Sequence, residues 1–185
     1  MTAVVYPEKI GNTQSTFLQT LFQIVGASLL LALVSQIKIS LPFTPVPITM
    51  QTFGMMLVGG VLGSRKGALA VLLYLVEATM GLPVLAGGTI NPAWLVCPSA
   101  GFLIGMVPQA YLTGWFFERR DRFGSLSLVT ATSLITLIHL AFGTVWLGQF
   151  FVGWENALLM GFYPFIPGGI FKLIALHLSL NSHHT

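Results

Sequence analysis

The sequence has 185 residues, of which 55% are hydrophobic and only 7% are charged. Soluble domains carry about 25% charged residues, so this composition excludes an ordinary water-soluble globule. The net charge is only +3, which reflects a scarcity of acidic residues, and no nucleic-acid partner is expected. We expect one all-α integral membrane domain over residues 1–185, embedded in the lipid bilayer.

Apolar windows separated by charged or proline-rich segments predict six transmembrane helices. Six helices place both termini on one side, and the positive-inside rule assigns that side to the cytoplasm because most basic residues then lie inside. Three irregular stretches, 42–51, 86–94 and 163–169, then fall on the outer side. The expected helices cover residues 17–37, 49–62, 67–80, 101–117, 125–147 and 157–180, the last interrupted at Pro164 and Pro167.

The first expected helix carries small residues along one face. Ser28, Ala32 and Ser35 follow at i, i+4 and i+7. In lipid, such a face lets another helix approach closely. The neighbour is either another helix of the same chain or a separate subunit, and the residues leave both alternatives open.

Two polar side chains inside the later helices need an explanation. Glu77, near the end of the third helix, is either a carboxylate at the membrane interface or cavity mouth, or the partner of Lys172 across a pocket. His139 lies among hydroxyl residues of the fifth helix. We interpret it as a neutral, hydrogen-bonded packing residue rather than a proton relay.

Lys172 is the first candidate for a ligand contact. It follows two prolines and two glycines in the run YPFIPGGIFK. A charged amine at membrane depth costs roughly 2.5 to 3.5 kcal/mol on insertion scales, so it normally faces a cavity. Broken membrane helices commonly supply such sites. We expect an outward-facing pocket with aromatic walls and few polar contacts, formed by Phe43, Phe53, Tyr74, Trp94, Phe165, Phe171, Gln51, Thr89, Asn91 and Lys172.

One buried cation in an aromatic pocket favours a small ligand with an apolar body and one carboxylate. The sequence contains no GxxxxGK[ST] loop, so the chain does not hydrolyse nucleotide by that route. It also lacks HExxH and GxSxG motifs, and Cys97 has no histidine nearby in sequence. We therefore expect no enzyme, catalytic residue, metal site or cofactor, but a binding subunit powered by other chains.

Three runs resemble the BioY family: LPFTPVPITMQTFGMMLVGGVLGSRKGALAVLLYLVEATMGLPVLAGG, CPSAGFLIG and PFIPGGIFK. Members of this family are the biotin-specific substrate-capture subunits, or S components, of energy-coupling factor (ECF) transporters. The resemblance implies a six-helix bundle of the bacterial inner membrane that binds biotin in an outward pocket. It also implies delivery of biotin inward with a transmembrane coupling subunit and two ABC-type ATPases, which use the ATP.

The resemblance also assigns roles to individual residues. Lys172 matches the lysine of the family's PGDxxK motif, and Ser28 and Ala32 are spaced like the small residues that contact the coupling subunit. Gly169 stands where the family usually has the aspartate of that motif. Thr89 holds a position that is often asparagine, and Asn91 is expected to substitute for it. These departures bear on affinity and fine specificity rather than on the ligand class.

A different reading of the same cavity stays open. The chain is alternatively a stand-alone or oligomeric facilitator of biotin or a related carboxylated vitamin. One sequence does not reveal its neighbours, so the sequence does not separate this reading from the S component.

Overall fold

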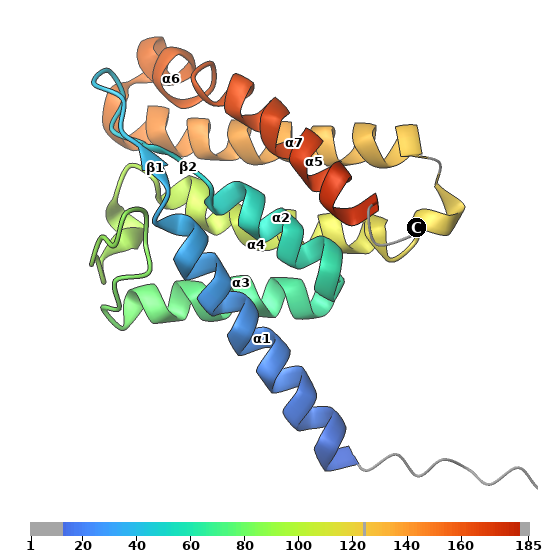
Figure 1. The fold of residues 1–185 in the computed structure, drawn as a ribbon. Helices are drawn as coiled ribbons and strands as arrows, with labels where there is room; N and C mark the ends of the chain where they lie inside the picture. Colours follow the sequence, from blue (N-terminus) through green and yellow to red (C-terminus); the bar gives the residue numbers. More distant parts are fainter. Residues whose placement is uncertain (1–12, 124, 182–185) are drawn as a thin grey trace, which may run out of the picture.

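Residues 13–123 and 125–181 are described by the structure, a computed structural model (Figure 1). It is a helical bundle with one very short pair of strands at one end. The predicted location of both termini in the cytoplasm concerns residues outside this described part. The elements are α1 (Thr13–Ser35), β1 (Lys38–Ile39), β2 (Ile48–Thr49), α2 (Gln51–Leu62), α3 (Ser64–Thr79), α4 (Ala100–Phe117), α5 (Ser125–Leu147), α6 (Trp154–Gly161) and α7 (Phe165–Asn181).

The six predicted helices are confirmed, with α6 and α7 as the two halves of the sixth. Pro164 lies between these halves as expected, but the predicted interruption at Pro167 is wrong. Pro167 is the third residue of α7, where the backbone N–H has no intrahelical partner and proline is tolerated. The third helix begins three residues earlier than predicted, at Ser64.

The two strands are an addition to the predicted all-α fold. β1 and β2 pair antiparallel, with Lys38 opposite Thr49 and Ile39 opposite Ile48. Each strand has only two residues, too few for an alternating pattern to appear in the sequence. The ladder folds the proline-rich connection between α1 and α2 back onto itself.

The outer surface of the bundle is apolar. Large side chains such as Phe22, Leu33 and Phe171 are 70% exposed or more, which water would disfavour but hydrocarbon accommodates. Three helical stretches are long and apolar enough to cross a membrane, namely Phe17–Ser35, Ser127–Val152 and Trp154–Leu176. The protein is thus a multi-pass membrane protein.

Glycines let α2 pack closely on its neighbours. A Cβ atom at Gly59 would overlap the carbonyl oxygen of Ala110 in α4, and one at Gly67 in α3 would lie 2.7 Å from the Gly59 Cα. Gly63 instead ends α2 with a positive φ of 82°, a conformation that favours glycine. The glycine cluster therefore serves both helix packing and a helix end.

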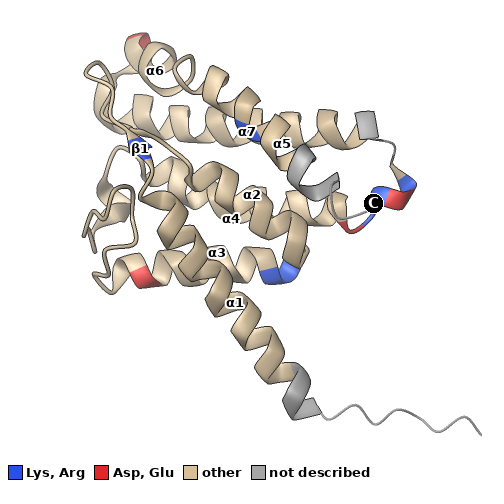
Figure 2. Cartoon of the chain, viewed as in Figure 1, with Lys and Arg blue, Asp and Glu red and all other residues tan. Residues whose placement is uncertain are grey.

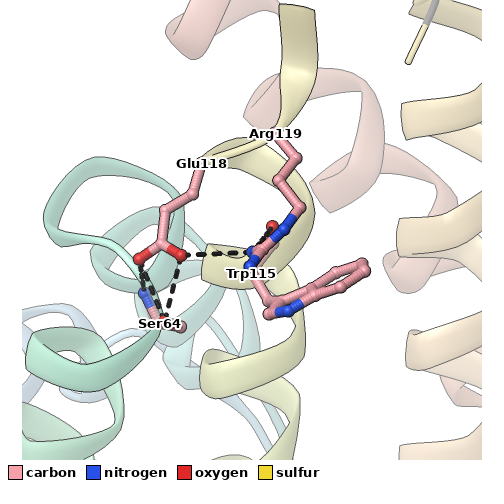
Figure 3. Close-up of polar contacts among 4 residues, drawn as sticks. All are labelled: Ser64, Trp115, Glu118 and Arg119. Carbon is pink, nitrogen blue, oxygen red and sulfur yellow. Dashed lines mark hydrogen bonds and ion pairs between the residues drawn. The ribbon is translucent and has the colours of Figure 1, made fainter. Parts of the chain in front are cut away.

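The connection after α4 is tied to the start of α3 by Glu118 (Figure 3). The Ser64 backbone N–H and hydroxyl donate to Glu118 Oε1 at 2.7 and 2.9 Å. Arg119 lies beside this carboxylate at 3.6 Å, and its guanidinium stacks 4.1 Å above the Trp115 ring. A carboxylate at a helix N-terminus satisfies unpaired N–H groups and the helix dipole, so Glu118 fixes how α3 and α4 meet.

Charged residues gather at this same end of the bundle. Figure 2 shows basic residues at the α2–α3 turn and in the connection between α4 and α5, far from β1 at the opposite end. They are Arg65, Lys66, Arg119, Arg120 and Arg122. The two ends of the bundle thus differ strongly in positive charge.

Candidate functional site

A cavity of about 380 Å³ lies at the end of the bundle that carries β1 and β2. Its volume falls within the usual range of small-ligand sites, roughly 300 to 1,000 Å³. The N-terminal halves of α2, α4 and α7, the middle of α5, the loop after α3 and the segment from β1 to β2 enclose it. The polar and aromatic side chains of its lining include Lys38, Thr49, Gln51, Thr52, Thr89, Asn91, Phe102, Thr136, His139, Phe165 and Lys172.

Lys172 reaches the cavity from α7 and is only 9% exposed. Its ammonium group donates to the carbonyl oxygen of Thr49 and, at 2.7 Å, to Thr52 Oγ1. Both acceptors are neutral: Thr49 is the last residue of β2, and Thr52 lies in the first turn of α2. An ammonium group has three protons, so one remains for a ligand.

Gln51 is held in place by a chain of hydrogen bonds behind the cavity wall. Its amide nitrogen donates to the Tyr74 hydroxyl at 2.5 Å, and its amide oxygen accepts from Thr49 Oγ1 at 3.1 Å. Tyr74 donates in turn to the Val84 carbonyl at 2.9 Å, which also accepts from Ser35. This chain links α1, α2, α3 and the loop after α3, and so orients Gln51.

The loop after α3 forms the rim of the cavity. Gly87 and Gly88 adopt positive φ angles of 64° and 72°, as their position in a glycine-rich loop predicts. The Gly87 N–H donates to the Ser35 carbonyl at 3.0 Å. Lys38 lies over Gly87, because a Cβ atom there would sit 2.8 Å from the lysine Nζ. The rim therefore places a second cation, Lys38, beside the cavity.

Five of the eight predicted ligand-contact residues line this cavity: Lys172, Gln51, Thr89, Asn91 and Gly169. Thr89 is exposed at the rim, where its hydroxyl donates to the Ala86 carbonyl at 2.8 Å. Gly169 has room beside it, since a Cβ atom would meet only Thr136 Cγ2 at 3.9 Å. Their roles in ligand binding stay predictions.

The other three predicted contacts do not reach the described lining. Phe43 is 54% exposed in the connection between the strands. Tyr74 is fully buried behind Gln51. Trp94 is turned away, with its indole N–H donating to Thr79 Oγ1 at 2.9 Å. Phe43 and Trp94 lie in irregular segments and Tyr74 in a helix, and position in the sequence does not fix the direction of a side chain.

The aromatic walls also differ from the prediction. Phe165 lines the cavity as expected, whereas Phe53 and Phe171 are not part of the described lining. Phe171 is 76% exposed and points to the outer surface. Phe102, which the sequence did not single out, packs against Phe165 with ring centroids 5.5 Å apart.

The small-residue face of α1 packs inside the chain. Ser28 is fully buried and donates to Glu77 Oε1 of α3 at 2.9 Å. Ala32 is partly buried against the same core. In this structure α3 of the same chain thus contacts this face at Ser28, and docking of a coupling subunit at Ser28 and Ala32 stays a prediction.

The hydrogen bond between Ser28 and Glu77 also bears on the two alternatives for Glu77. The Glu77 carboxylate accepts from Ser28, whereas the Lys172 ammonium donates to Thr49 and Thr52. The predicted pair of Glu77 with Lys172 is therefore wrong. The two residues lie on different elements, and Glu77 is not in the described cavity lining.

Several lining residues escaped the sequence reasoning. Thr52 lay unmarked in an apolar helix, and only the fold brings it to Lys172. Lys38 had a usable signal, because it was the one basic residue outside the membrane-embedded part on the predicted outer side. His139 lines the cavity, whereas its sequence context predicts only a neutral, hydrogen-bonded packing residue.

Residues 9–185 match the BioY family. The chain belongs to the BioY family. It is 38% identical to the biotin transporter BioY of Rhizobium etli over 88% of this chain and 89% of that protein. It is also 36% identical to the biotin transporter BioY of Rhodobacter capsulatus, over 78% and 86% of the two chains. The crystal structure of the S-component for biotin from an ECF-type ABC transporter superposes with a TM-score of 0.81, at 28% identity over 92% of both chains.

The charge of the cavity is the decisive property of this BioY-family chain. Its described lining contains two lysines, Lys38 and Lys172, and no aspartate or glutamate. A carboxylate brought in by a ligand would thus be the only acidic group beside two cations. The described lining thus combines positive charge with apolar side chains.

Proposed function

We propose that this chain captures biotin from outside the cell and delivers it inward as the S component of an ECF-type ABC transporter. The family membership and the names of the relatives supply the ligand class. The observation that carries the assignment to the cavity is its lining, which combines Phe102 and Phe165 with Lys172 and has no described carboxylate. A small acid with an apolar body meets both requirements of such a site.

The transport step requires partners in this proposal. A transmembrane coupling subunit and two ABC-type ATPases supply the energy, because this sequence carries no P-loop motif of its own. The relatives are named as transporters, so we assign this chain no catalytic activity and no cofactor. Biotin is its ligand, and ATP is used by the partner subunits.

The orientation follows from the charge of the two ends. We place the chain in the bacterial inner membrane with the basic end, which includes Arg65 and Arg120, and both termini in the cytoplasm. The cavity then faces outward, where it is open to external biotin. Reporter fusions at each terminus test this orientation, because a reporter active only in the cytoplasm should work at both ends.

Labelled-biotin uptake tests the function. Cells that lack biotin synthesis and all coupling subunits should not accumulate biotin when they express this chain alone, and should do so when the coupling module is added. Uptake by the chain alone would instead support a stand-alone facilitator. A purified chain that prefers lipoate to biotin in a binding titration would contradict the ligand assignment.

A further inference from the structure

Lys38 is a cation at the entrance of the cavity. It is exposed on β1 and belongs to the cavity lining, whereas the other lysine of that lining, Lys172, is buried. None of the described residues forms an ion pair or a hydrogen bond with the Lys38 ammonium group. The positive charge of Lys38 is therefore open to a ligand that carries the opposite charge.

The Lys38 side chain is held against the loop after α3. A Cβ atom built on Gly87 of this loop would lie 2.6 Å from Lys38 Cδ and 2.8 Å from Lys38 Nζ. Gly87 has a positive φ of 64°, and its N–H donates to the Ser35 carbonyl at 3.0 Å, which ties the loop to the end of α1. The missing side chain of Gly87 thus leaves a place for the lysine stem. The stem packs on the loop while the charged end stays at the entrance.

The backbone of Lys38 is fixed relative to the buried lysine. Lys38 pairs with Thr49 in the antiparallel ladder, and beside this pair the Met50 N–H donates to the Ile37 carbonyl at 3.1 Å. The carbonyl oxygen of Thr49 accepts a hydrogen bond from the Lys172 ammonium group. Thr49 therefore connects the two cations. Because Lys38 is exposed and Lys172 is buried, a carboxylate that enters from the solvent meets Lys38 first.

We propose that Lys38 is a specificity-determining residue of the cavity entrance, which attracts the carboxylate of incoming biotin and raises the rate at which it binds. This inference rests on the proposed function. Charges of one sign around a cleft with low-dielectric walls concentrate ligands of the opposite sign and raise association rates. Here Lys38 and Lys172 supply the charge, and the described lining holds no carboxylate that would cancel it.

The two lysines then have different tasks in one binding event. Lys172 is buried and hydrogen-bonded, so its effect falls on the bound complex and on the dissociation rate. Lys38 is exposed, so water and salt screen it, and its effect falls on the approach of the ligand. The entrance thereby favours organic anions over neutral molecules of the same shape.

The test measures association rate constants on the purified full chain by stopped flow, with biotin and with its neutral amide, biotinamide. Two unit charges about 5 to 10 Å apart in water attract enough to change a rate roughly two- to fourfold. We expect Lys38→Met to slow biotin association about two- to fourfold in about 0.01 M salt, where the Debye length is about 30 Å. In about 1 M salt, where it is about 3 Å, the difference should vanish. Biotinamide association should be unchanged in both.

Three further variants separate charge from shape and from position. Lys38→Arg keeps the charge and should stay near the wild-type rate, whereas Lys38→Glu should be slower than Lys38→Met, because it repels the carboxylate. Lys66→Met makes the same change of net charge at the opposite end of the bundle, where Lys66 donates to Gln23 Oε1 at 2.8 Å, and should have no effect. Elution from a size-exclusion column verifies that each variant is folded.

Two outcomes overturn the inference. One is an equal biotin association rate for Lys38→Met and wild type at low salt. The other is an equal slowing of biotin and biotinamide, which would mean that Lys38 only shapes the rim. A wild-type chain that binds no biotin overturns the proposed function itself, which separates the two failures.

Discussion

Replacing Lys172 by methionine tests which end of biotin the lysine binds. Methionine keeps most of the volume and the flexible chain but removes the ammonium group. The structure shows that two of the three protons of this group are used, by the Thr49 carbonyl and Thr52 Oγ1. The remaining proton supports one hydrogen bond to the ligand carboxylate.

A hydrogen bond that involves a charged group contributes about 1.5 to 3 kcal/mol. We therefore expect Lys172→Met to weaken biotin binding by about 10- to 150-fold, since about 1.4 kcal/mol corresponds to a factor of ten. The effect should exceed that of an exposed ion pair, because Lys172 is only 9% exposed and water competes little there. Thr49 and Thr52 then lose a donor, which affects the free and bound protein alike.

The assay is a four-way comparison of wild type and Lys172→Met, each titrated with biotin and with biotinamide, in which the carboxylate is replaced by a neutral amide. If Lys172 binds the carboxylate, the substitution should cost little affinity for biotinamide, and the two changes should not add. Equal losses for both ligands would refute the reasoning, because the lysine would then contact another part of biotin. A folded control away from the cavity, such as Thr130→Ser on the exposed face of α5, should leave all four affinities near those of wild type.

Three further predictions concern helix packing and helix ends. Glu118→Gln should lower the free energy of unfolding because the negative charge at the α3 N-terminus is lost. The loss should be only about 0.5 to 1 kcal/mol, since the Glu118 side chain is 41% exposed and water screens its charge. An unchanged melting temperature in detergent would contradict the capping role. Gly59→Ala should destabilise by about 1 to 3 kcal/mol through overlap with Ala110. Gly169→Ala should stabilise the folded protein by about 0.5 to 1 kcal/mol, because α7 has room for the added methyl group. A higher melting temperature for Gly59→Ala than for Gly169→Ala would contradict the close approach of α2 and α4.

The fold was predictable because lipid imposes strong rules on sequence. Long apolar windows, charged turns and prolines determined the six helices, and the single break near Pro164 followed from the missing N–H of proline. Pro167 misled the prediction because the effect of a proline depends on its place in a helix, and the sequence did not show that α7 begins at Phe165. The two-residue strands left no periodic signal at all.

The site was most predictable where a residue conflicted with its surroundings. Lys172 conflicted with an apolar helix, and glycines 87 and 88 with regular structure, and both belong to the cavity or its rim. Aromatic residues such as Phe43 and Trp94 agree with any apolar environment, so their sequence positions did not reveal which way the rings point. Thr52 became significant only through its contact with a residue 120 positions away.

The hydrogen bonds that Ser64 donates to the Glu118 carboxylate make the two ends of the bundle differ in rigidity. The hydrogen bond from Ser64 to Glu118 holds α3 and α4 together at one end of the helical bundle. The opposite end is built from three loops and a ladder of two residue pairs. We therefore expect ligand entry to move the rim while the end held by Glu118 stays still. Amide exchange should slow on ligand addition in residues 84–99, and remain the same around the α2–α3 turn.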